Sequence, residues 1–353
     1  MDKIQYHTYT VADLKAWIIR GEDNGLSERI ISLTRANALM HCPYVKDDDV
    51  MVISAMDGDN VVGYTAIFPE HLLRPDMWIA MGTTLWVNPD YADDFVGYNL
   101  VQRLWKAYPQ YSVIGSDVSR PAAMIDKLLG ACILKYERHG FVFHRNIQVH
   151  SLRNLASRVL EPYRIYRQRK AVGRVMAMIP ANIRVIARDT IDAEAYDFIC
   201  AHSESDTFLR SREMLNWILR YPFSVENSLV RYAVKSNAFS DQVGVNRNYL
   251  LQIYMADMLI GIVMFGYRGN DMHVKMLYTD TTHKELVFAL IIDTMVNSSI
   301  ERLYSLYPEL NAFIATHQVA LRDTVQPLLF TYPKSIKCLE PFVLQGIDGD
   351  MFA

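Results

Sequence analysis

The sequence predicts an α/β fold (α+β in detail), built as two similar domains in tandem, each with a mixed, mostly antiparallel sheet flanked by helices. The chain has 353 residues, about twice the length of a typical domain. Two strands, a loop and an amphipathic helix follow one another within residues 61–104, and a similar order of elements returns after residue 181. We therefore expect a first domain over residues 1–150, a basic helical linker over 151–180 and a second domain over 181–353.

The stretch 61–104 organises the first domain. Apolar residues alternate through 61–68 and again through 78–87, where β-branched and aromatic residues dominate, as in strands that bury one face. Asn88-Pro89-Asp90 then breaks the pattern, and from Val96 the apolar residues follow the period of a helix. A strand that ends in a loop and feeds a helix N-terminus gathers free backbone N–H groups at one point, which suits an anionic ligand.

The remaining elements of the first domain flank this stretch. Before it, we expect helices after Thr10 and Ser27, and a hairpin whose two strands meet in a turn at residues 57–60. After it, the pattern predicts a strand over 111–116, a helix capped by Ser119 with Ala122, Ile125, Leu128 and Leu129 inward, and closing strands over 133–136 and 141–149.

The second domain repeats this order. We expect a strand over 183–187, helices that begin at Asp192 and Ser211, and a hairpin that turns at Ala256-Asp257. Its sequence Ile260-Gly261-Ile262 echoes Val62-Gly63-Tyr64, and Met272–Met276 echoes Met77–Met81. A helix from about Lys284, a strand over 302–306 and a helix opened by Pro308 follow.

Three segments resemble a known superfamily, the GNAT acyltransferases. Residues 86–97 stand where that superfamily has the loop R/Q-x-x-G-x-G/A, whose backbone amides hold the pyrophosphate of acetyl-CoA; Gly97 matches the motif, whereas Ala92, Asp93 and Phe95 depart from it. Residues 207–223, TFLRSREMLNWILRYPF, resemble tandem GNAT and FemAB-related acyltransferases of bacterial surface-polysaccharide clusters. The C-terminal segment from Gln345 to Asp350 resembles the terminal D-G-D of the same group.

The resemblance implies acetyl-CoA or another acyl-CoA as the donor. The backbone at the end of the second strand and at the start of the following helix would hold it, which assigns cofactor contacts to Val87, Phe95, Val96, Gly97 and Tyr98. The alternative is an ordinary loop that contains one glycine.

Acyl transfer from a thioester to an amine needs a group that polarises the carbonyl, a base for the ammonium and an acid for the thiolate. Candidate catalytic residues in the first domain are Asp117 and Ser119 after the strand expected over 111–116, and Tyr136 further on. In the second domain the candidates are Asp280 with His283 as a base that orients the acceptor, and Tyr304 as an acid. Each also has a plain structural interpretation, such as a helix cap for Ser119.

The segment 207–223 supplies candidate contacts to the acceptor. Arg210 and Arg220 could clamp a carboxylate or phosphate of a sugar, and Trp217 lies between them in the sequence. The alternative is that both arginines lie on the surface of an amphipathic helix.

Composition argues against several other function classes. The net charge of −3 disfavours a nucleic-acid partner. The ten histidines and four cysteines show no HExxH, HxH or CxxC spacing, so no metal is expected and the cysteines read as reduced thiols of a cytoplasmic protein. No apolar run reaches the length of a membrane span, and the N-terminus lacks the apolar core of a signal peptide.

The segment 151–174 differs from the rest because it is rich in Arg and Lys and has Glu161 as its only acid. Three interpretations stay open: a solvated linker helix, a peripheral contact with anionic lipid or a lipid-phosphate-linked sugar, and a contact between domains.

From the sequence we expect an N-acyltransferase that moves an acyl group from acyl-CoA to an amine. The expected acceptor is a small molecule, an amino sugar or nucleotide sugar of surface polysaccharide. One alternative is a degenerate GNAT pair that serves as a binding or scaffold module, which Asp93, Asp94 and the missing glycines favour. The other is FemX-like aminoacyl transfer from charged tRNA, which only the basic linker supports and the net charge disfavours.

Overall fold

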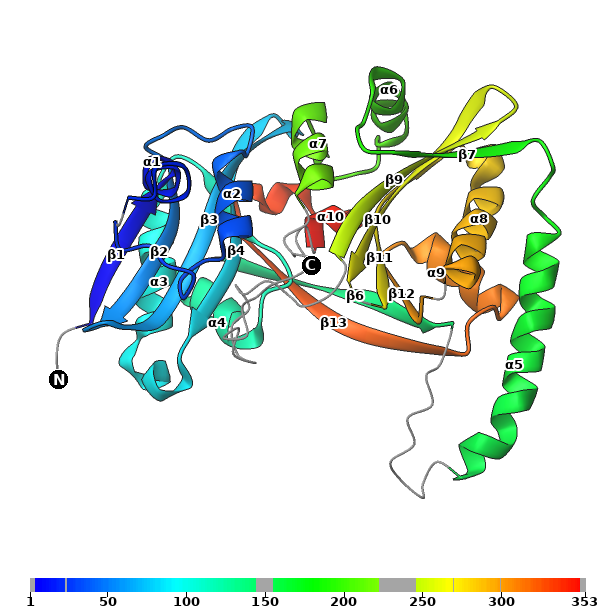
Figure 1. The fold of residues 1–353 in the computed structure, drawn as a ribbon, viewed down its shortest axis with the longest axis horizontal. Helices are drawn as coiled ribbons and strands as arrows, with labels where there is room; N and C mark the ends of the chain where they lie inside the picture. Colours follow the sequence, from blue (N-terminus) through cyan, green and yellow to red (C-terminus); the bar gives the residue numbers. More distant parts are fainter. Residues whose placement is uncertain are drawn as a thin grey trace.

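The computed structural model describes residues 4–22, 24–143, 155–221, 246–268, 270–298 and 300–349. Its strands form one continuous sheet in the order β1-β2-β3-β4-β5-β13-β6-β12-β11-β10-β9-β7, and the short strand β8 pairs with β3 outside this path. β6 and β13 run through the middle of the molecule, and the other strands lie on either side of them (Figure 1).

In the described residues, the first half contains six strands and four α-helices, besides a short π-helix over Ala16–Arg20 and a 3-10 helix over Pro89–Asp94. The strands are β1 (Gln5–Thr10), β2 (Val50–Asp57), β3 (Asn60–Arg74), β4 (Met77–Val87), β5 (Ser112–Gly115) and β6 (Cys132–Val142). The helices are α1 (Val11–Lys15), α2 (Leu33–Met40), α3 (Val96–Ala107) and α4 (Arg120–Leu128).

The second half follows the helix α5 (Leu155–Met176). Its strands are β7 (Ile183–Arg188), β8 (Leu209–Arg210), β9 (Asn246–Met255), β10 (Met258–Arg268), β11 (Asp271–Thr279), β12 (Arg302–Ser305) and β13 (Arg322–Tyr332). Its helices are α6 (Ala193–His202), α7 (Arg212–Arg220), α8 (Lys284–Asn297), α9 (Pro308–His317) and α10 (Gly346–Gly349).

The strand order reveals an exchange between the halves. In each half a parallel pair, β4 with β5 or β11 with β12, follows an antiparallel hairpin. The last strand of each half then lies beside the parallel pair of the other half, because β13 pairs with β5 and β6 pairs with β12. The two exchanged strands pair with each other from Cys132–Tyr332 to Val142–Arg322. Each half is therefore completed by a strand of the other.

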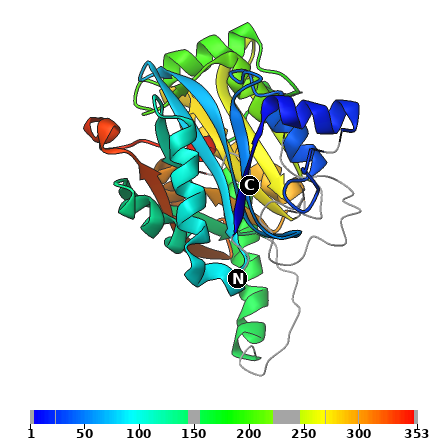
Figure 2. The same ribbon diagram turned by 90° about the vertical axis from the view of Figure 1, so that its left-hand side faces the viewer.

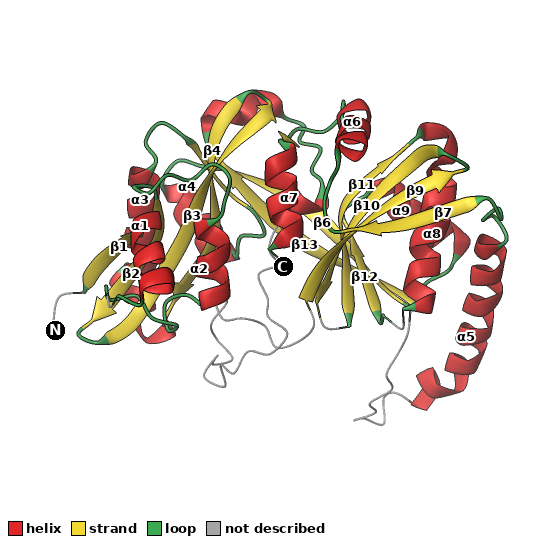
Figure 3. Cartoon of the chain, turned by 45° about the horizontal axis from the view of Figure 1, so that its top comes forward, coloured by secondary structure: helices red, strands yellow, loops and turns green. Residues whose placement is uncertain are grey.

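Helices cover the two faces of this sheet. On one face, α3 packs against β2, β3 and β4 in the first half (Figure 2), and α8 and α9 cover the second half together with α5. On the other face, one apolar core contains buried residues of α2, α6 and α7 and runs across both halves. The views in Figures 1 and 3 show α2 and α7 near the middle of this face.

Glycines explain how each covering helix approaches its sheet. A Cβ atom at Gly63 of β3 would lie 3.0 Å from side-chain atoms of Val96 and Leu100 of α3. A Cβ atom at Gly261 of β10 would lie 2.7 Å from Val287 of α8. The similarity of the sequences around these glycines thus has a structural cause, the close packing of a helix on a strand.

The expected fold class is confirmed: the sheet is mixed and mostly antiparallel, helices flank it, and two halves follow in matching order. Several expected helix starts are also confirmed, including those capped by Thr10, Ser119, Asp192 and Ser211. The structure places β13, part of the residues 181–353 assigned to the second domain, between two strands of residues 1–150. The exact domain boundaries stay a prediction.

Three local expectations were wrong. The closing strands expected as two pieces form the single strand β6, and residues 144–149 lie outside the described residues. The helix expected from Ser27 begins at Leu33, with Ser32 as its cap. Leu128 of α4 was expected to face inward and is 75% exposed. For α4 the reason is that Ala122, Ala123 and Asp126, rather than the larger apolar residues, form the face turned toward the sheet.

Candidate functional site

The first half has an opening where its two parallel strands separate. The ladder between β4 and β5 pairs Ile79–Gly82 with Ser112–Gly115 and ends there, although β4 continues to Val87. Thr83 is the extra residue of a β-bulge, because Ala66 pairs with Thr84 and Ile67 with Gly82. Bulges are frequent beside active sites, where they redirect the backbone and end strand pairing.

A cavity of about 250 Å³ lies at this separation. Its walls come from β4, the end of β5, the loop that follows and the helices α3 and α4; the lining residues include Thr83, Thr84, Leu85, Leu104, Trp105, Gly115, Ser116, Asp117, Ser119, Ala122, Asp126 and Thr331. Thr331 belongs to β13, so the second half contributes one wall. The cavity is thus bounded by an open strand edge, apolar side chains and a few polar groups, as is usual for small-molecule sites.

Asp126 is the carboxylate that this cavity buries most. Its Oδ2 accepts a hydrogen bond from Thr331 Oγ1 at 2.7 Å. Burial raises the pKa of Asp126 to about 6, although the hydrogen bond from Thr331 acts in the opposite direction. A Cβ atom at Gly115 would lie 2.7 Å from Thr331 Oγ1, so the glycine leaves the space that this hydroxyl occupies. The carboxyl group can therefore hold or release a proton near neutral pH.

The expected cofactor contacts lie around the start of α3. Phe95 occupies the N-cap position with a left-handed backbone (φ 56°) and is 72% exposed, and no side chain caps the helix. Val96 and Gly97 are buried. A Cβ atom at Gly97 would lie 3.1 Å from Ile125 of α4 and 3.4 Å from Val87. Gly97 therefore also has a packing role, since it lets α3 approach α4 closely.

The loop that leads to α3 is held in place by polar contacts. Asn88 Oδ1 accepts a hydrogen bond from the backbone N–H of Asp90 at 3.1 Å. The hydroxyl of Tyr91 donates to Asp57 at 2.7 Å. Within α3 itself, Tyr98 accepts a hydrogen bond from Gln102 at 3.5 Å. Asp90, Asp93 and Asp94 are exposed, so water screens their charges.

The candidate catalytic residues of the first domain are only partly brought together. Asp117, which has a left-handed backbone (φ 49°), and Ser119 both line the first cavity. Asp117 lies 3.7 Å from Arg138, and Ser119 caps α4 by accepting from Ala122 N. Tyr136 does not line this cavity. It lines a separate cavity of about 630 Å³ between β6, α9 and residues 342–344.

The second half has the same strand separation, and it is filled. The parallel ladder between β11 and β12 ends at His273–Tyr304, and Lys275 is the extra residue of a bulge, because Met264 pairs with Met276 and Phe265 with Val274. This bulge makes Lys275 the counterpart of Thr83, which shifts the expected sequence echo by three residues. The C-terminal segment lies directly against it: a Cβ atom at Gly346 would lie 2.1 Å from the carbonyl oxygen of Val274.

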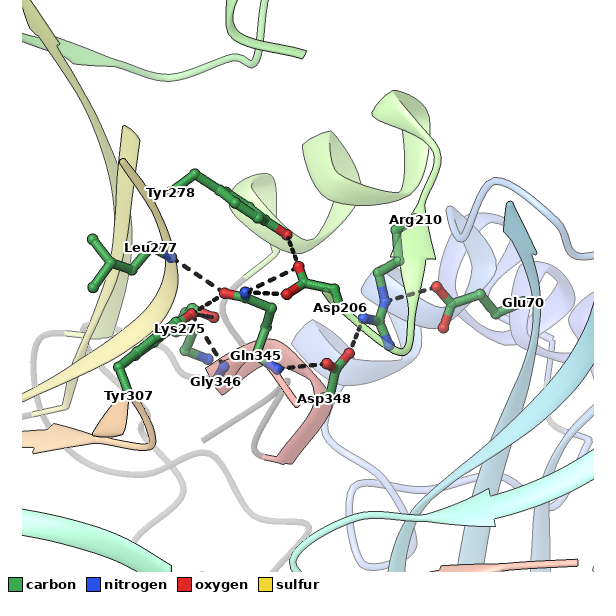
Figure 4. A network of polar contacts seen from close by, with 10 residues as sticks. All are labelled: Glu70, Asp206, Arg210, Lys275, Leu277, Tyr278, Tyr307, Gln345, Gly346 and Asp348. Atoms are coloured by element: carbon green, nitrogen blue, oxygen red, sulfur yellow. Dashed lines mark hydrogen bonds and ion pairs between the residues drawn. The ribbon is translucent and has the colours of Figure 1, made fainter. Parts of the chain in front are cut away.

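A polar network holds this C-terminal segment in place (Figure 4). The Gln345 side-chain oxygen accepts from Leu277 N at 3.4 Å and from the hydroxyl of Tyr307, while its amide donates to both oxygens of Asp206 at 2.9 and 3.0 Å. Asp206 also accepts from Tyr278 at 2.6 Å. Gln345 thus occupies the backbone edge of β11 beside the bulge. The equivalent edge of β4 in the first half faces the cavity. Burial raises the pKa of Asp206 to about 6.

The network continues to the first half through Arg210. Its Nε lies 2.7 Å from Glu70 of β3, a charge contact without hydrogen-bond alignment, and its Nη1 donates to Asp348 of α10 (Figure 4). All three side chains are fully buried. Burial raises the pKa of Glu70 to about 7 and also raises the pKa of Asp348, while the charge of Arg210 opposes both shifts.

Of the three candidate acceptor contacts, Arg210 and Trp217 are buried, whereas Arg220 is exposed. Arg210 lies in the strand β8, not on a helix surface, and its guanidinium is held by two carboxylates inside the protein. Trp217 is buried in α7, where its indole donates to the carbonyl of Ala38 at 2.8 Å. Arg220 is exposed at the end of α7, with its guanidinium 5.6 Å from the ring centre of Tyr221. The first two residues thus connect the halves, because Arg210 joins β3 to α10 and Trp217 joins α7 to α2.

Among the candidate catalytic residues of the second half, the structure brings Asp280 and His283 together. Asp280 accepts from Thr282 N at 2.7 Å and lies 3.3 Å from His283, which is the usual arrangement of a helix start. This backbone hydrogen bond is the main reason why the pKa of Asp280 is lowered. Tyr304 is buried on β12, where its ring stacks on His273 at 4.7 Å.

Sequence reasoning missed Asp126, Thr83 and Thr331. A signal existed for Asp126, because it lies one turn after Ala122 and Ala123 and so shares their inward face. Thr83 sits in a run that reads as a regular strand, and the bulge appears only through the pairing with β3. Thr331 reaches the cavity through the strand exchange, which sequence order does not reveal.

Two searches of the described residues bear on the expectations from composition. Within the described ranges, no three His, Cys, Asp or Glu side chains gather as they would around a metal ion. Among the helices that the structure describes, none has the length and apolar character needed to cross a membrane.

Comparison with known proteins identifies the fold. No family model matches the sequence, and no curated protein matches it. A GCN5-related N-acetyltransferase from Kribbella flavida superposes with a TM-score of 0.51 at 13% identity, covering 94% of this chain and 71% of the other. A putative acetyltransferase from Pyrococcus horikoshii gives 0.50 at 11% identity and covers 94% and 89%.

A third structure extends the comparison to another acyl group. The N-myristoyltransferase of Saccharomyces cerevisiae with bound myristoyl-CoA gives a TM-score of 0.50 at 10% identity and covers 94% of this chain and 83% of the other. At such low identity the likeness shows the fold alone. Together with the matching strand order of the two halves, it establishes that this chain has the GNAT N-acyltransferase fold in tandem.

Proposed function

We propose that this protein is an N-acyltransferase that binds one acyl-CoA in the first half and transfers the acyl group to an amine. The observation that carries the proposal is the open separation of β4 and β5 at the Thr83 bulge, with its cavity of about 250 Å³. The fold comparison supports it, since the similar structures include N-acetyltransferases and an N-myristoyltransferase with bound acyl-CoA.

The open edge of β4 explains how a donor would be held. After Gly82, no strand of the described ranges pairs with the backbone N–H and C=O groups on the β5 side of β4. The amide groups of a pantetheine chain could pair with this edge as an added strand does. The uncapped start of α3 would face the pyrophosphate with backbone N–H groups. The exposed carboxylates of Asp93 and Asp94 weaken this attraction only modestly, because solvent and salt screen them.

In the proposed reaction the neutral amine attacks the thioester carbonyl, so that a C–N bond forms and the C–S bond breaks. The amine loses a proton, and the leaving thiolate gains one. Asp126 and Asp117 line the cavity and are the carboxylates that could exchange a proton with these groups. Positioning of the two substrates, rather than one strong catalytic group, would supply most of the acceleration.

The finer proposal is that the acceptor is an amino sugar or nucleotide sugar in the cytoplasm. It is supported by the resemblance of residues 207–223 to acyltransferases of surface-polysaccharide clusters, although Arg210 and Trp217 of that segment are buried. A second candidate function is a binding module without catalysis. It is favoured by the side chains of Ala92, Asp93 and Phe95, which stand where the donor loop of the fold has Arg or Gln and glycines.

Calorimetric titration with acetyl-CoA tests the proposal, with two variants matched between the halves. Ala122→Phe on α4 fills the first cavity. Ala312→Phe on α9 projects into the separate cavity of about 630 Å³ between β6, α9 and residues 342–344. We expect one bound acetyl-CoA per chain, a loss of affinity of about tenfold or more for Ala122→Phe, and no change for Ala312→Phe. Release of free thiol in the presence of glucosamine then measures transfer.

The opposite results separate the alternatives. No heat at millimolar acetyl-CoA would favour the binding module. Binding that Ala312→Phe removes and Ala122→Phe leaves intact would place the donor in the second half and contradict the proposal. Binding without thiol release from glucosamine or a nucleotide amino sugar would keep the donor site and reject the acceptor class.

A further inference from the structure

A pocket rich in arginine lies at the outer edge of the second half, away from both strand separations. The helix α5 runs along this edge (Figure 1) and packs against α8 and α9. Between α5 and the turn that joins α9 to β13 lies a pocket of about 470 Å³, here called the arginine pocket. It is lined by Arg164, Arg167 and Gln168 of α5 and by Gln318, Ala320, Leu321 and Arg322.

Among the described residues, no acid balances the charge of this pocket. In the described part of the chain, Arg164, Arg167 and Arg322 form no ion pair, and no carboxylate lines the pocket. Arginines elsewhere do find acids, as Arg302 does with Asp271 at 2.7 Å. Three guanidinium groups around one space repel one another, and that repulsion favours a bound anion.

The walls of the arginine pocket are held in position. Arg167 donates a hydrogen bond to the side-chain oxygen of Gln318, the residue that ends α9 with a left-handed backbone (φ 55°). Gln168 donates to the backbone carbonyl of Phe143 at 3.0 Å, which fixes α5 against the end of β6. Arg164 and Arg167 are one helical turn apart, so they point to the same side of α5. The pocket therefore exists before a ligand binds.

The chemistry of these side chains selects phosphate. Guanidinium groups present several N–H donors in a planar fork that fits the oxygens of a phosphate, and they cannot accept a hydrogen bond. A single carboxylate would neutralise one of the three charges, whereas a phosphate monoester carries about −1.5 to −2 at neutral pH and a diphosphate more. We propose that the arginine pocket binds a phosphate or diphosphate group, carried either by a soluble ligand or by a lipid headgroup.

Two exposed tyrosines of α5 lie beside the arginine pocket and are relevant to a lipid ligand. Tyr163 and Tyr166 of α5 are 59% and 64% exposed, and the guanidinium of Arg167 lies 5.9 Å from the ring centre of Tyr163. Exposed tyrosines next to arginines are typical of surfaces that touch lipid headgroups. The proposal does not depend on acyl transfer, because the arginine pocket and the first cavity share no residue.

The test uses the full-length protein and two double variants of equal charge. Arg164→Gln with Arg322→Gln removes two walls of the pocket, while Arg169→Gln with Arg174→Gln removes the same charge from exposed positions of α5 outside it. Inorganic pyrophosphate is titrated calorimetrically at moderate salt. We expect saturable binding that weakens about tenfold or more in the pocket variant and less than about twofold in the control variant. Unchanged thermal unfolding shows that both variants are folded.

Vesicle sedimentation distinguishes the two sources. Vesicles of phosphatidylcholine alone are compared with vesicles of equal parts phosphatidylcholine and phosphatidylglycerol. Sedimentation with the anionic vesicles that only the pocket variant loses, without pyrophosphate binding, supports the lipid headgroup. Pyrophosphate binding without sedimentation supports the soluble ligand. If neither probe binds, or if both double variants weaken binding equally, the proposal is wrong and α5 carries only diffuse charge.

Discussion

The two halves of this protein share a strand order but differ in what occupies the point where their parallel strands separate. In the first half a bulge at Thr83 opens to a cavity that Asp126 and Thr331 line. In the second half the equivalent bulge at Lys275 is covered by Gly346, and Gln345 accepts a hydrogen bond from the buried backbone N–H of Leu277 in β11. One half thus leaves a cavity at this point, and in the other the chain itself fills the space.

The two halves also depend on each other through contacts between them. The C-terminal segment that fills the second site is tied to the first half through Arg210, Glu70 and Asp348. Conversely, β13 of the second half supplies Thr331 to the first cavity. The second half therefore contributes contacts that stabilise the first half, and substitutions in the second half are expected to act on both.

The largest expected effect comes from breaking the connection at Arg210. Replacement by Met leaves the carboxylates of Glu70 and Asp348 buried without their cation. Removal of one partner from a buried ion pair typically costs about 3–5 kcal/mol. We expect the free energy of unfolding, measured by urea denaturation at neutral pH, to fall by that amount.

The matched control is Arg220→Met, at the exposed end of α7. Its expected effect is within about 0.5 kcal/mol, as for most surface substitutions. A similar loss in both variants would mean that Arg210 contributes only as a surface arginine does, and the connection between the halves would lose its basis.

The next effect tests whether the second site is tightly filled. A Cβ atom at Gly346 would lie 2.1 Å from one backbone oxygen and 2.8 Å from the Cα atom of Lys275, so Gly346→Ala must displace the C-terminal segment. We expect a loss of about 2–3 kcal/mol in the free energy of unfolding. Gly173→Ala in α5 meets no atom within 4 Å and should instead gain about 0.5–1 kcal/mol.

Calorimetric titration of the wild-type protein tests whether the filled second site excludes acetyl-CoA. Wild-type protein is expected to bind one acetyl-CoA per chain, since Gly346 lies against the bulge of β11 and Gln345 accepts a hydrogen bond from its backbone at Leu277. A wild-type stoichiometry of two would contradict the comparison outright. So would a Gly346→Ala variant as stable as wild type, because it would show that the segment is loosely placed.

The sequence predicted most of the architecture because the elements carry local signals. Alternating apolar residues and caps such as Ser119 and Asp192 depend on neighbours in the chain, and they located strands and helices correctly. The glycine echo of Gly63 and Gly261 also had a local cause, the approach of a helix to a strand. Local patterns therefore sufficed for element type and order.

The candidate site was less accessible to sequence reasoning, because its parts meet through long-range pairing. The exchange of β6 and β13 brings Thr331 into the first cavity, and no local pattern encodes it. Arg210 reads as a surface residue until the fold places Glu70 and Asp348 beside it. A buried charge looks like an exposed one in a sequence, and only the partners distinguish them.

A smaller effect is expected from substitution of one buried aspartate in each half, Asp126 and Asp206. The pKa of Asp126 and that of Asp206 are both raised to about 6, mainly by burial. A carboxyl group with a raised folded pKa favours the folded state while it is protonated, and this contribution is lost as pH rises from about 4 through about 6. Asp126→Asn removes that loss. The free energy of unfolding of the variant minus that of the wild type should therefore be about 1–2 kcal/mol larger at pH 7 than at pH 4.

Asp206→Asn is expected to gain less than Asp126→Asn at neutral pH. Asp206 accepts hydrogen bonds from Tyr278 and twice from Gln345, whereas Asp126 accepts one from Thr331. An asparagine at 206 would turn an N–H group toward these donors, at a net cost of about 1 kcal/mol. Urea denaturation at both pH values measures each variant. A gain of equal size in both variants would show that burial alone, not the network, governs these residues.

The smallest effect concerns the loops before α3 and α8. Phe95 holds a left-handed backbone (φ 56°) and is 72% exposed, so its side chain contributes little packing, while His283 at the same place in the second half has an ordinary backbone (φ −109°) and lies 3.3 Å from Asp280. Phe95→Gly should therefore raise the free energy of unfolding by about 0.5–1 kcal/mol, because glycine adopts φ > 0 without strain. His283→Gly should lower it by a similar amount, through the entropy of glycine. Thermal unfolding of both variants measures the effects. A stabilised His283→Gly or a destabilised Phe95→Gly would mean that the strain lies in the second loop and not in the one beside the open site.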